Sequence, residues 1–181
     1  MNILTKLGTI KFKIKYYSTR ILLYLFVLPK KSFGAEIGVR WGGNAKLLYY
    51  LTRPKELILV DSYEELEIHS PEVIKGMIDR VQKWVRNRNI LLYKESSKET
   101  STWYFEYRGF SFLDWVYIDA DHEDLYNDLT YWYDNLCDGG IIMGDDYGNT
   151  YPQIKTALDR FCKERNLKYK TLHYQWWLRK S

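Results

Sequence analysis

Cysteine and long apolar runs are scarce in this sequence of 181 residues. Its two cysteines, Cys137 and Cys162, form no CxxC pair, which suggests buried thiols in a reducing compartment, with a single disulfide as the alternative. The most apolar stretch, Ile21–Pro29, is too short for a membrane span, which needs about 20 residues. Repeats, low-complexity tracts and Pro- or Gly-rich linkers are absent. The length and these absences predict one cytoplasmic domain with a sizeable core.

Acidic and basic side chains are separated along the chain. Residues 1–35 hold seven Lys and Arg and no acid, whereas the remainder holds 20 Lys and Arg against 23 Asp and Glu. From Asp119 to Asp146 there are nine carboxylates and no Lys or Arg. A nucleic-acid groove needs Lys and Arg to neutralise phosphates. Because the candidate site residues are acidic, the sequence predicts that the protein binds no nucleic acid.

The basic N-terminal segment, residues 1–33, precedes the predicted main domain, residues 34–181. It joins Lys and Arg to the apolar stretch Ile21–Pro29. Two interpretations stay open. In the first, a helix packs on the domain or covers its active site. In the second, a basic amphipathic anchor lies on an anionic membrane surface, which would make the protein peripheral to the membrane.

Beyond residue 34, short apolar runs alternate with helical periods. Strands that alternate with helices are joined by right-handed crossovers and form a mostly parallel sheet covered on both faces. The predicted strands are Ala35–Val39, Leu57–Val60, Ile90–Tyr93, Trp115–Ile118 and Ile141–Gly144, with one or two more in Tyr169–Leu178. The predicted helices are Asn44–Leu51, Ser70–Val85, Lys98–Tyr107, Leu125–Leu136 and Ile154–Cys162, and Gly139-Gly140 is predicted as a turn.

Polar residues follow each predicted strand. They are Glu36–Gly43, Asp61, Ser96, Asp119–His122 and Asp145–Asp146. In parallel sheets with helices on both faces, ligands bind beyond the carboxyl ends of the strands. The sequence therefore predicts one site at that edge of the sheet.

The first part of this predicted site is the segment Glu36–Gly43, EIGVRWGG, where glycines join a strand to a helix. It matches neither GxGxxG nor GxxxxGK[ST], which excludes a P-loop. Asp61 ends the next strand, where an acid can accept hydrogen bonds from both hydroxyls of a ribose. Glu36 would repel a pyrophosphate and suits an ammonium group instead. A nucleoside that carries an amino acid, such as S-adenosylmethionine, fits this pattern.

Five stretches together resemble class I S-adenosylmethionine-dependent methyltransferases. They are AEIGVRWGG, ILVDSYEE, KESS, VYIDADHEDLYNDLTYW and LCDGGIIMGDDYGN. The sequence is most similar to the small O-methyltransferase-like family, methyltransferase family 24, whose relatives are sugar O-methyltransferases and cephalosporin hydroxylase-like proteins. The resemblance implies an α/β fold, a Rossmann-like three-layer sandwich with a mostly parallel seven-stranded sheet whose last strand is antiparallel.

The resemblance also implies roles for individual residues. For the cofactor S-adenosylmethionine it implies Glu36, Gly38 and Gly42 at the methionine part, Asp61 and Ser62 at the ribose, Ser96 near the adenine, and Asp119 after the fourth strand. In metal-dependent relatives, the acids at Asp119, Asp145 and Asp146 hold Mg²⁺. Ligands of this kind, all oxygen, suit Mg²⁺ or Ca²⁺.

The predicted catalytic residues are Asp119 and His122. Mg²⁺ would lower the pKa of an acceptor hydroxyl, and His122 would take its proton as general base. The alternative for His122 is a local hydrogen bond at a helix N-terminus. The other acids between Asp119 and Asp145 are expected to cap the helix or to lie on the solvated surface.

The leading hypothesis is a Mg²⁺-assisted O-methyltransferase that acts on a small hydroxylated molecule, such as a sugar or polysaccharide precursor. One alternative is a non-methylating S-adenosylmethionine-binding or hydroxylase-like protein of the same fold. Another is a membrane-surface interaction protein. The chain is short for a substrate lid, so the cap over the site is expected from residues 1–33, from Tyr63–His69 or from a partner subunit of a homo-oligomer.

Overall fold

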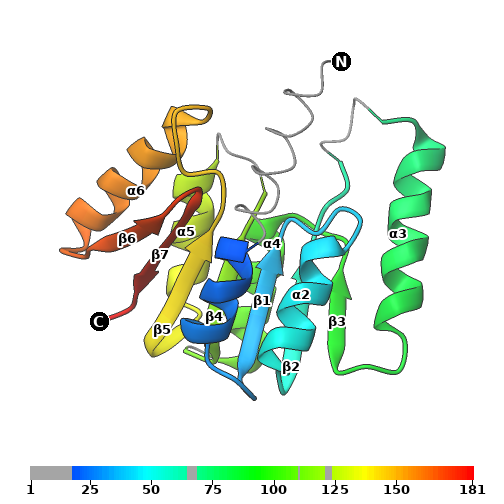
Figure 1. Cartoon of the computed structure of the whole chain (residues 1–181). Coiled ribbons are helices and arrows are strands. Elements are labelled where there is room, and N and C mark those ends of the chain that lie inside the picture. Colours follow the sequence, from blue (N-terminus) through cyan, green and yellow to red (C-terminus); the bar gives the residue numbers. More distant parts are fainter. Residues whose placement is uncertain (1–17, 65–68, 110, 121–123) are drawn as a thin grey trace.

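The computed structural model describes residues 18–64, 69–109, 111–120 and 124–181 (Figure 1). A seven-stranded sheet runs through its centre in the order β3-β2-β1-β4-β5-β7-β6. The strands are β1 Phe33–Ile37, β2 Glu56–Val60, β3 Ile90–Tyr93, β4 Leu113–Ile118, β5 Leu136–Gly144, β6 Tyr169–Leu172 and β7 Gln175–Arg179. The first five are parallel, and β7 is antiparallel to both of its neighbours. The predicted sheet is confirmed, including the antiparallel last strand.

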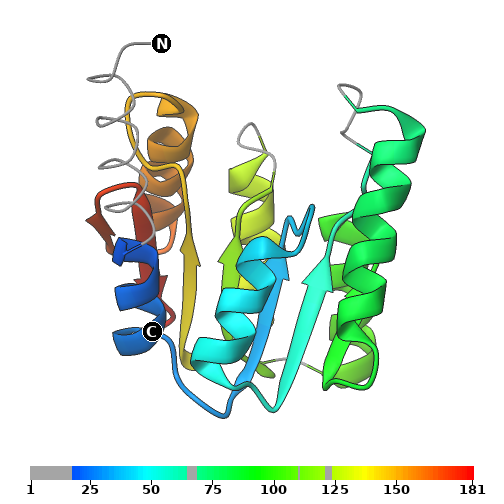
Figure 2. The same ribbon diagram turned by 45° about the vertical axis from the view of Figure 1, so that its right-hand side comes forward.

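Helices cover both faces of this sheet, which makes three layers (Figures 1 and 2). They are α2 Gly43–Thr52, α3 Pro71–Val85, α4 Ser97–Arg108, α5 Leu125–Tyr133 and α6 Pro152–Glu164, preceded by a helical segment at 18–26. Side chains alternate between the faces along each strand. In β4, Val116 and Ile118 face the core under α5 and α6, whereas Trp115 and Tyr117 face the core under α2 and α3. Both faces are buried, so the central strands are almost continuously apolar.

The described part of the N-terminal segment packs on the domain. Leu23, Tyr24 and Leu28 are buried in the same core cluster as α2, and Figure 2 shows helix 18–26 and α2 over one face of the sheet. The outer side of the helix carries Leu22 and Phe26, which are exposed. Among the helices that the structure describes, none is long and apolar enough to cross a membrane. The boundary predicted at residue 33 stays a prediction.

One sequence prediction is wrong between α5 and β5. The helix ends at Tyr133 instead of continuing to Leu136, and Gly139 and Gly140 belong to β5 instead of forming a turn. Leu136 is fully buried and pairs with Leu113 of β4. In β5, Leu136 is therefore buried in the same core that it would occupy if α5 continued to this residue. The β4–β5 register shifts between Leu113 and Trp115, and Gly139 has a φ of 75°. This irregularity accommodates the glycines within the strand.

Candidate functional site

The site begins where β1 ends and its backbone meets the end of β4. Gly38 has a φ of 87°, and a Cβ on it would lie 2.1 Å from the carbonyl oxygen of Asp119. Only glycine fits this close approach. Gly42 has a φ of 69°, donates its N–H to Val39, and serves as the N-cap of α2. Both predicted glycines thus shape the loop, and Gly38 also lines the two cavities described below.

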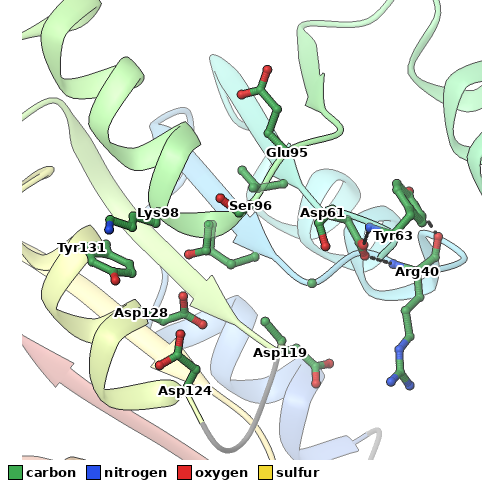
Figure 3. Close-up of a pocket in the computed structure, with 16 residues that line it drawn as sticks. Arg40, Asp61, Tyr63, Glu95, Ser96, Lys98, Asp119, Asp124, Asp128 and Tyr131 are labelled. Carbon is green, nitrogen blue, oxygen red and sulfur yellow. Dashed lines mark hydrogen bonds between the residues drawn. The ribbon is translucent and has the colours of Figure 1, made fainter. Parts of the chain in front are cut away.

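Asp61, at the end of β2, holds the loop after β1. Its Oδ2 accepts the N–H groups of Val39 and Arg40, each at 2.7 Å, and its Oδ1 accepts the N–H of Tyr63 at 2.8 Å. Figure 3 shows the bonds from Arg40 and Tyr63. A carboxylate offers about four lone-pair sites. Asp61 therefore shapes the loop with three of them and keeps acceptor capacity toward the cavity that it lines.

A first cavity of about 350 Å³ opens at the carboxyl ends of β1, β2, β3 and β4. Among its lining residues are the predicted Gly38, Asp61, Ser62, Ser96 and Asp119, joined by Tyr63, Glu95, Lys98, Asp124, Asp128 and Tyr131 (Figure 3). The hydroxyl of Ser96 donates to Glu99 at 2.7 Å and accepts the N–H of Glu99 at 3.2 Å. Ser96 thus caps α4 in a reciprocal arrangement with Glu99 while it lines this cavity.

A second cavity of about 310 Å³ shares Gly38 with the first. It is lined by Glu36, Trp41, Asn44, Asp146 and Tyr151, among others. Gly38, Arg40, Asp119 and Ala120 line both cavities. Asp119 therefore borders both cavities, and we call this place their junction.

Glu36 is fully buried beside the second cavity. Its Oε1 accepts a hydrogen bond from Asn44 Nδ2 at 3.0 Å, and its Oε2 has no hydrogen-bond partner among the described residues. Burial raises the pKa of this carboxyl well above its ordinary value, and the hydrogen bond from Asn44 opposes the shift. A buried acceptor without a partner is costly. Glu36 therefore suits a ligand that brings an N–H donor, above all a positively charged one.

Three acids at the ends of β4 and β5 come together, as the sequence predicts. Each of Asp119, Asp145 and Asp146 places one carboxylate oxygen within 4.8 Å of the others. Such an oxygen set suits a hard cation. A cation from the chain is already there: the guanidinium of Arg20 contacts Asp145 and lies 3.9 Å from Asp119 Oδ2.

Arg20 and Asp128 are site residues that sequence reasoning missed. Arg20 comes from helix 18–26, more than a hundred residues before Asp145, and no local pattern links the two. Asp128 was expected on the surface with the other helix acids, which is wrong: its exposed fraction is 3% and it lines the first cavity. It stands between Leu125 and Leu129 on the buried side of α5. That helical spacing is a signal that could have placed it.

The predicted base, His122, lies outside the described residues, as does Asp121. Asp124 is the N-cap residue of α5 and makes no side-chain cap hydrogen bond, while it lines the first cavity. Ser62 also lines that cavity, and its Oγ accepts the N–H of Glu64 at 3.3 Å. The roles of these residues stay predictions.

Several solved methyltransferase structures superpose on this chain. The N-methyltransferase NodS from Bradyrhizobium japonicum matches with a TM-score of 0.61 and 15% identity, over 92% of this chain and 95% of that chain. This chain therefore shares its fold with that methyltransferase. An O-methyltransferase from Bacillus cereus, solved in complex with S-adenosylhomocysteine, matches with a TM-score of 0.61 and 16% identity, over 90% of this chain and 81% of that chain.

The same fold extends beyond methyltransferases. Spermidine synthase from Thermotoga maritima matches with a TM-score of 0.59 and 15% identity, over 89% of this chain and 57% of that chain. No protein-family model matches the sequence, and no curated protein matches it either. The predicted fold is confirmed, and the resemblance to family 24 in particular stays a prediction.

Proposed function

We propose that this protein transfers the methyl group of S-adenosylmethionine to a hydroxyl of a small molecule. The observation that carries the proposal is the pair of cavities that meet at Asp119, with Asp61 in one and Glu36 beside the other. In this fold, ligands bind beyond the carboxyl ends of the strands. The likeness to an O-methyltransferase in complex with S-adenosylhomocysteine supports S-adenosylmethionine as the donor.

The donor is proposed to span both cavities. Its nucleoside part would occupy the first cavity, where Asp61 has acceptor capacity for a ribose hydroxyl and Tyr131 and Ala120 offer apolar surface for the base. Its amino-acid part would reach the second cavity, where the ammonium group meets the buried Oε2 of Glu36. The positive sulfonium would then lie near the junction at Asp119, whose carboxylate favours a cation.

The reaction itself would be a displacement at the sulfonium methyl. The acceptor oxygen forms a bond to the methyl carbon, the carbon–sulfur bond breaks with its electrons left on sulfur, and the hydroxyl proton passes to a base. Asp119 at the junction and the predicted His122 are the candidate bases. Positioning by the cavity walls would supply much of the rate enhancement.

A small polar acceptor is favoured over a polyanion. Glu95, Asp124 and Asp128 line the first cavity, and Asp146 lines the second. Acids outnumber the lining bases Arg40 and Lys98, so phosphates would be repelled, whereas hydroxyl groups donate hydrogen bonds to the acids. Tyr151 in the second cavity adds an aromatic ring of the kind that packs on a sugar. A sugar or another hydroxylated metabolite is therefore the proposed acceptor class.

The Mg²⁺ predicted from the sequence has no part in this proposed mechanism. The three acids have suitable oxygen ligands, but Arg20 lies against two of them. Donor binding at Asp61 and Glu36 does not depend on how the acid cluster is neutralised.

Methyl transfer can be tested with a donor whose methyl group carries deuterium. The protein would be incubated with this donor and pools of sugars, sugar nucleotides and other hydroxylated metabolites, and the products analysed by mass spectrometry. The proposal predicts a product heavier by one deuterated methyl group, together with S-adenosylhomocysteine. The variant Asp119→Asn should form neither of these two products. Donor binding with no product from any pool would favour the alternative, a non-methylating protein that binds the donor.

We also propose that the outer side of helix 18–26 contacts an anionic membrane surface. Leu22, Leu25 and Phe26 are exposed there, Phe26 to 81%, and they follow a sequence segment that holds Lys and no acid. Apolar side chains beside basic ones are typical of interfacial helices. Because Tyr24 and Arg20 belong to the core and the site, deletion of residues 1–33 would disturb the whole domain.

A double substitution, Leu22→Ser with Phe26→Ser, tests this contact without touching the buried side of the helix. Flotation with vesicles that contain phosphatidylglycerol should carry the wild type upward and leave the variant behind. Vesicles of phosphatidylcholine alone are the control for charge. Equal flotation of the wild type and the variant would rule out the proposed contact.

A further inference from the structure

Arg20 brings a buried positive charge into the acidic cluster. Its side chain is 6% exposed, it contacts Asp145, whose side chain is 1% exposed, and it lies 3.9 Å from Asp119 Oδ2. We propose that Arg20 is the resident cation of the cluster formed by Asp119, Asp145 and Asp146, and that it takes the place of a divalent metal ion. The inference stands on these contacts and is independent of methyl transfer.

The guanidinium of Arg20 is held by more than the two acids. Its Nη1 donates to Asn44 Oδ1 at 3.1 Å, and its Cζ lies 5.7 Å from the centre of the Tyr117 ring. Asn44 is itself fixed, because its Oδ1 also accepts the hydroxyl of Tyr24 at 2.7 Å. An arginine held by a carboxylate, an amide and a ring is a geometrically specific arrangement.

The carboxylate of Asp145, the partner of Arg20, is also held by hydrogen bonds. Asp145 accepts one hydrogen bond from Arg20 through Oδ2 and another from Gln175 Nε2 through Oδ1. Gln175 is buried, and its Oε1 accepts the hydroxyl of Tyr117 at 3.0 Å. Each oxygen of the Asp145 carboxylate therefore has a donor from the chain. Truncation of one member of such a buried pair is strongly destabilising because it leaves the other charge uncompensated.

A divalent ion cannot bind Asp145 Oδ2 while Arg20 contacts the same oxygen. Mg²⁺ binds oxygen at about 2.1 Å, so an ion on Asp145 Oδ2 would meet the nitrogen that already contacts this oxygen. Arginine keeps its proton in proteins and cannot become neutral to make room. At such spacing the two positive charges repel each other strongly in a buried setting. Asp145 Oδ2 therefore holds either Arg20 or a metal ion, but not both.

Under this assignment helix 18–26 is part of the site, because it carries Arg20. Tyr24, one turn after Arg20, is fully buried against the ring of Tyr117 at a centroid distance of 5.4 Å. The packing of the helix thus determines where the charge of Arg20 lies. Removal of the arginine charge should leave three neighbouring carboxylates that attract a divalent ion.

Mn²⁺ is a suitable probe because its free form is measured by electron paramagnetic resonance. Four full-length proteins would be titrated: the wild type, Arg20→Gln, Arg20→Lys, and Arg86→Gln as a matched control at an exposed arginine. We expect Arg20→Gln to bind one Mn²⁺ at least about tenfold more tightly than the wild type. Arg20→Lys and Arg86→Gln should resemble the wild type. The new site should disappear when Asp145→Asn is added to Arg20→Gln.

The wild-type arm keeps the test decisive if Arg20→Gln does not fold, which circular dichroism would reveal. Mn²⁺ binding by the wild type that is lost in Asp146→Asn would overturn the assignment. A folded Arg20→Gln that binds Mn²⁺ no better than the wild type would overturn it as well. The assignment is supported if the wild type has no Mn²⁺ site, or none that Asp146→Asn removes. None of these readouts requires a methyl donor, so they do not depend on the proposed reaction.

Discussion

Gly38 and Asp119 meet backbone to backbone at the junction of the two cavities, where a Cβ on Gly38 would lie 2.1 Å from the Asp119 carbonyl oxygen. Because the obstacle is backbone and the φ of Gly38 is 87°, Gly38→Ala cannot be accommodated by a side-chain movement. We expect this variant to lose more than about 1 kcal/mol of unfolding free energy. Chemical denaturation would measure the loss, and binding of S-adenosylhomocysteine should weaken with it.

Gly43 is the matched control in the same loop. A Cβ on Gly43 would meet nothing within 4 Å, and the residue is the first of α2. Gly43→Ala should therefore change stability by less than about 1 kcal/mol, in the stabilising direction. Equal destabilisation by both substitutions would show that the close approach at Gly38 has no special role.

The pKa of Glu36 gives a pH prediction. Burial raises this pKa well above its ordinary value, so the carboxyl of the free protein is protonated over a range above that ordinary value. An ammonium group bound at Oε2 would favour the ionised form. Donor binding should then release a proton and should tighten as the pH rises through this range. Calorimetry of S-adenosylhomocysteine in buffers with different ionisation enthalpies would detect the proton.

The substitution Glu36→Gln should abolish that proton release and weaken binding. Glu56→Gln is the control, because Glu56 begins β2 and pairs with Arg108 outside both cavities. Proton release that persists in Glu36→Gln would assign it to another group and contradict the proposed place of the ammonium.

Substitution of Ser96 separates two roles of this residue, the capping of α4 and a contact near the adenine. Its hydroxyl exchanges hydrogen bonds with Glu99 at the start of α4. Ser96→Ala should therefore lower the unfolding free energy by roughly 1 kcal/mol, as measured by denaturation. We expect the affinity for S-adenosylhomocysteine to change little. A large loss of affinity at unchanged stability would instead establish the contact near the adenine that the sequence predicts.

Tyr24 tests whether helix 18–26 belongs to the domain. Its hydroxyl donates to Asn44 at 2.7 Å, and its ring is fully buried. Tyr24→Phe should lower the unfolding free energy by roughly 1 to 2 kcal/mol. Phe26→Ser, on the exposed side of the same helix, should change it by less than about 0.5 kcal/mol. No difference between the two would mean that the helix does not unfold with the domain.

Much of the fold was predictable because both faces of the sheet are buried. The apolar run of Leu57–Val60 allowed a strand prediction that matches β2 to within one residue, and Ile90–Tyr93 matches β3. The prediction failed at Leu136, which satisfies the helical period of α5 and the core contacts of β5 equally well. A hydrophobic pattern records which side chains are buried and does not distinguish these two ways of burying one of them.

The acids of the site were predictable for a different reason. Asp61, Asp119 and Asp145 each follow an apolar run, and parallel strands bring their carboxyl ends to one edge. Arg20 was not predictable, because its contact with Asp145 depends on how helix 18–26 packs over the sheet. Asp61 was predicted as a ligand contact, and the sequence gives no sign that it also holds the loop at Val39 and Arg40.

The proposed donor site is tested most directly by calorimetry with S-adenosylhomocysteine. Asp61→Ala is compared with Asp114→Ala, which also removes a carboxylate that accepts a backbone N–H, that of Phe33 at 2.8 Å, but lines neither cavity. We predict one bound ligand per wild-type chain and an affinity at least about tenfold lower in Asp61→Ala, equal to about 1.4 kcal/mol. Asp114→Ala should bind as the wild type does. Folded wild-type protein that binds no ligand, or undiminished binding by Asp61→Ala, would contradict the account.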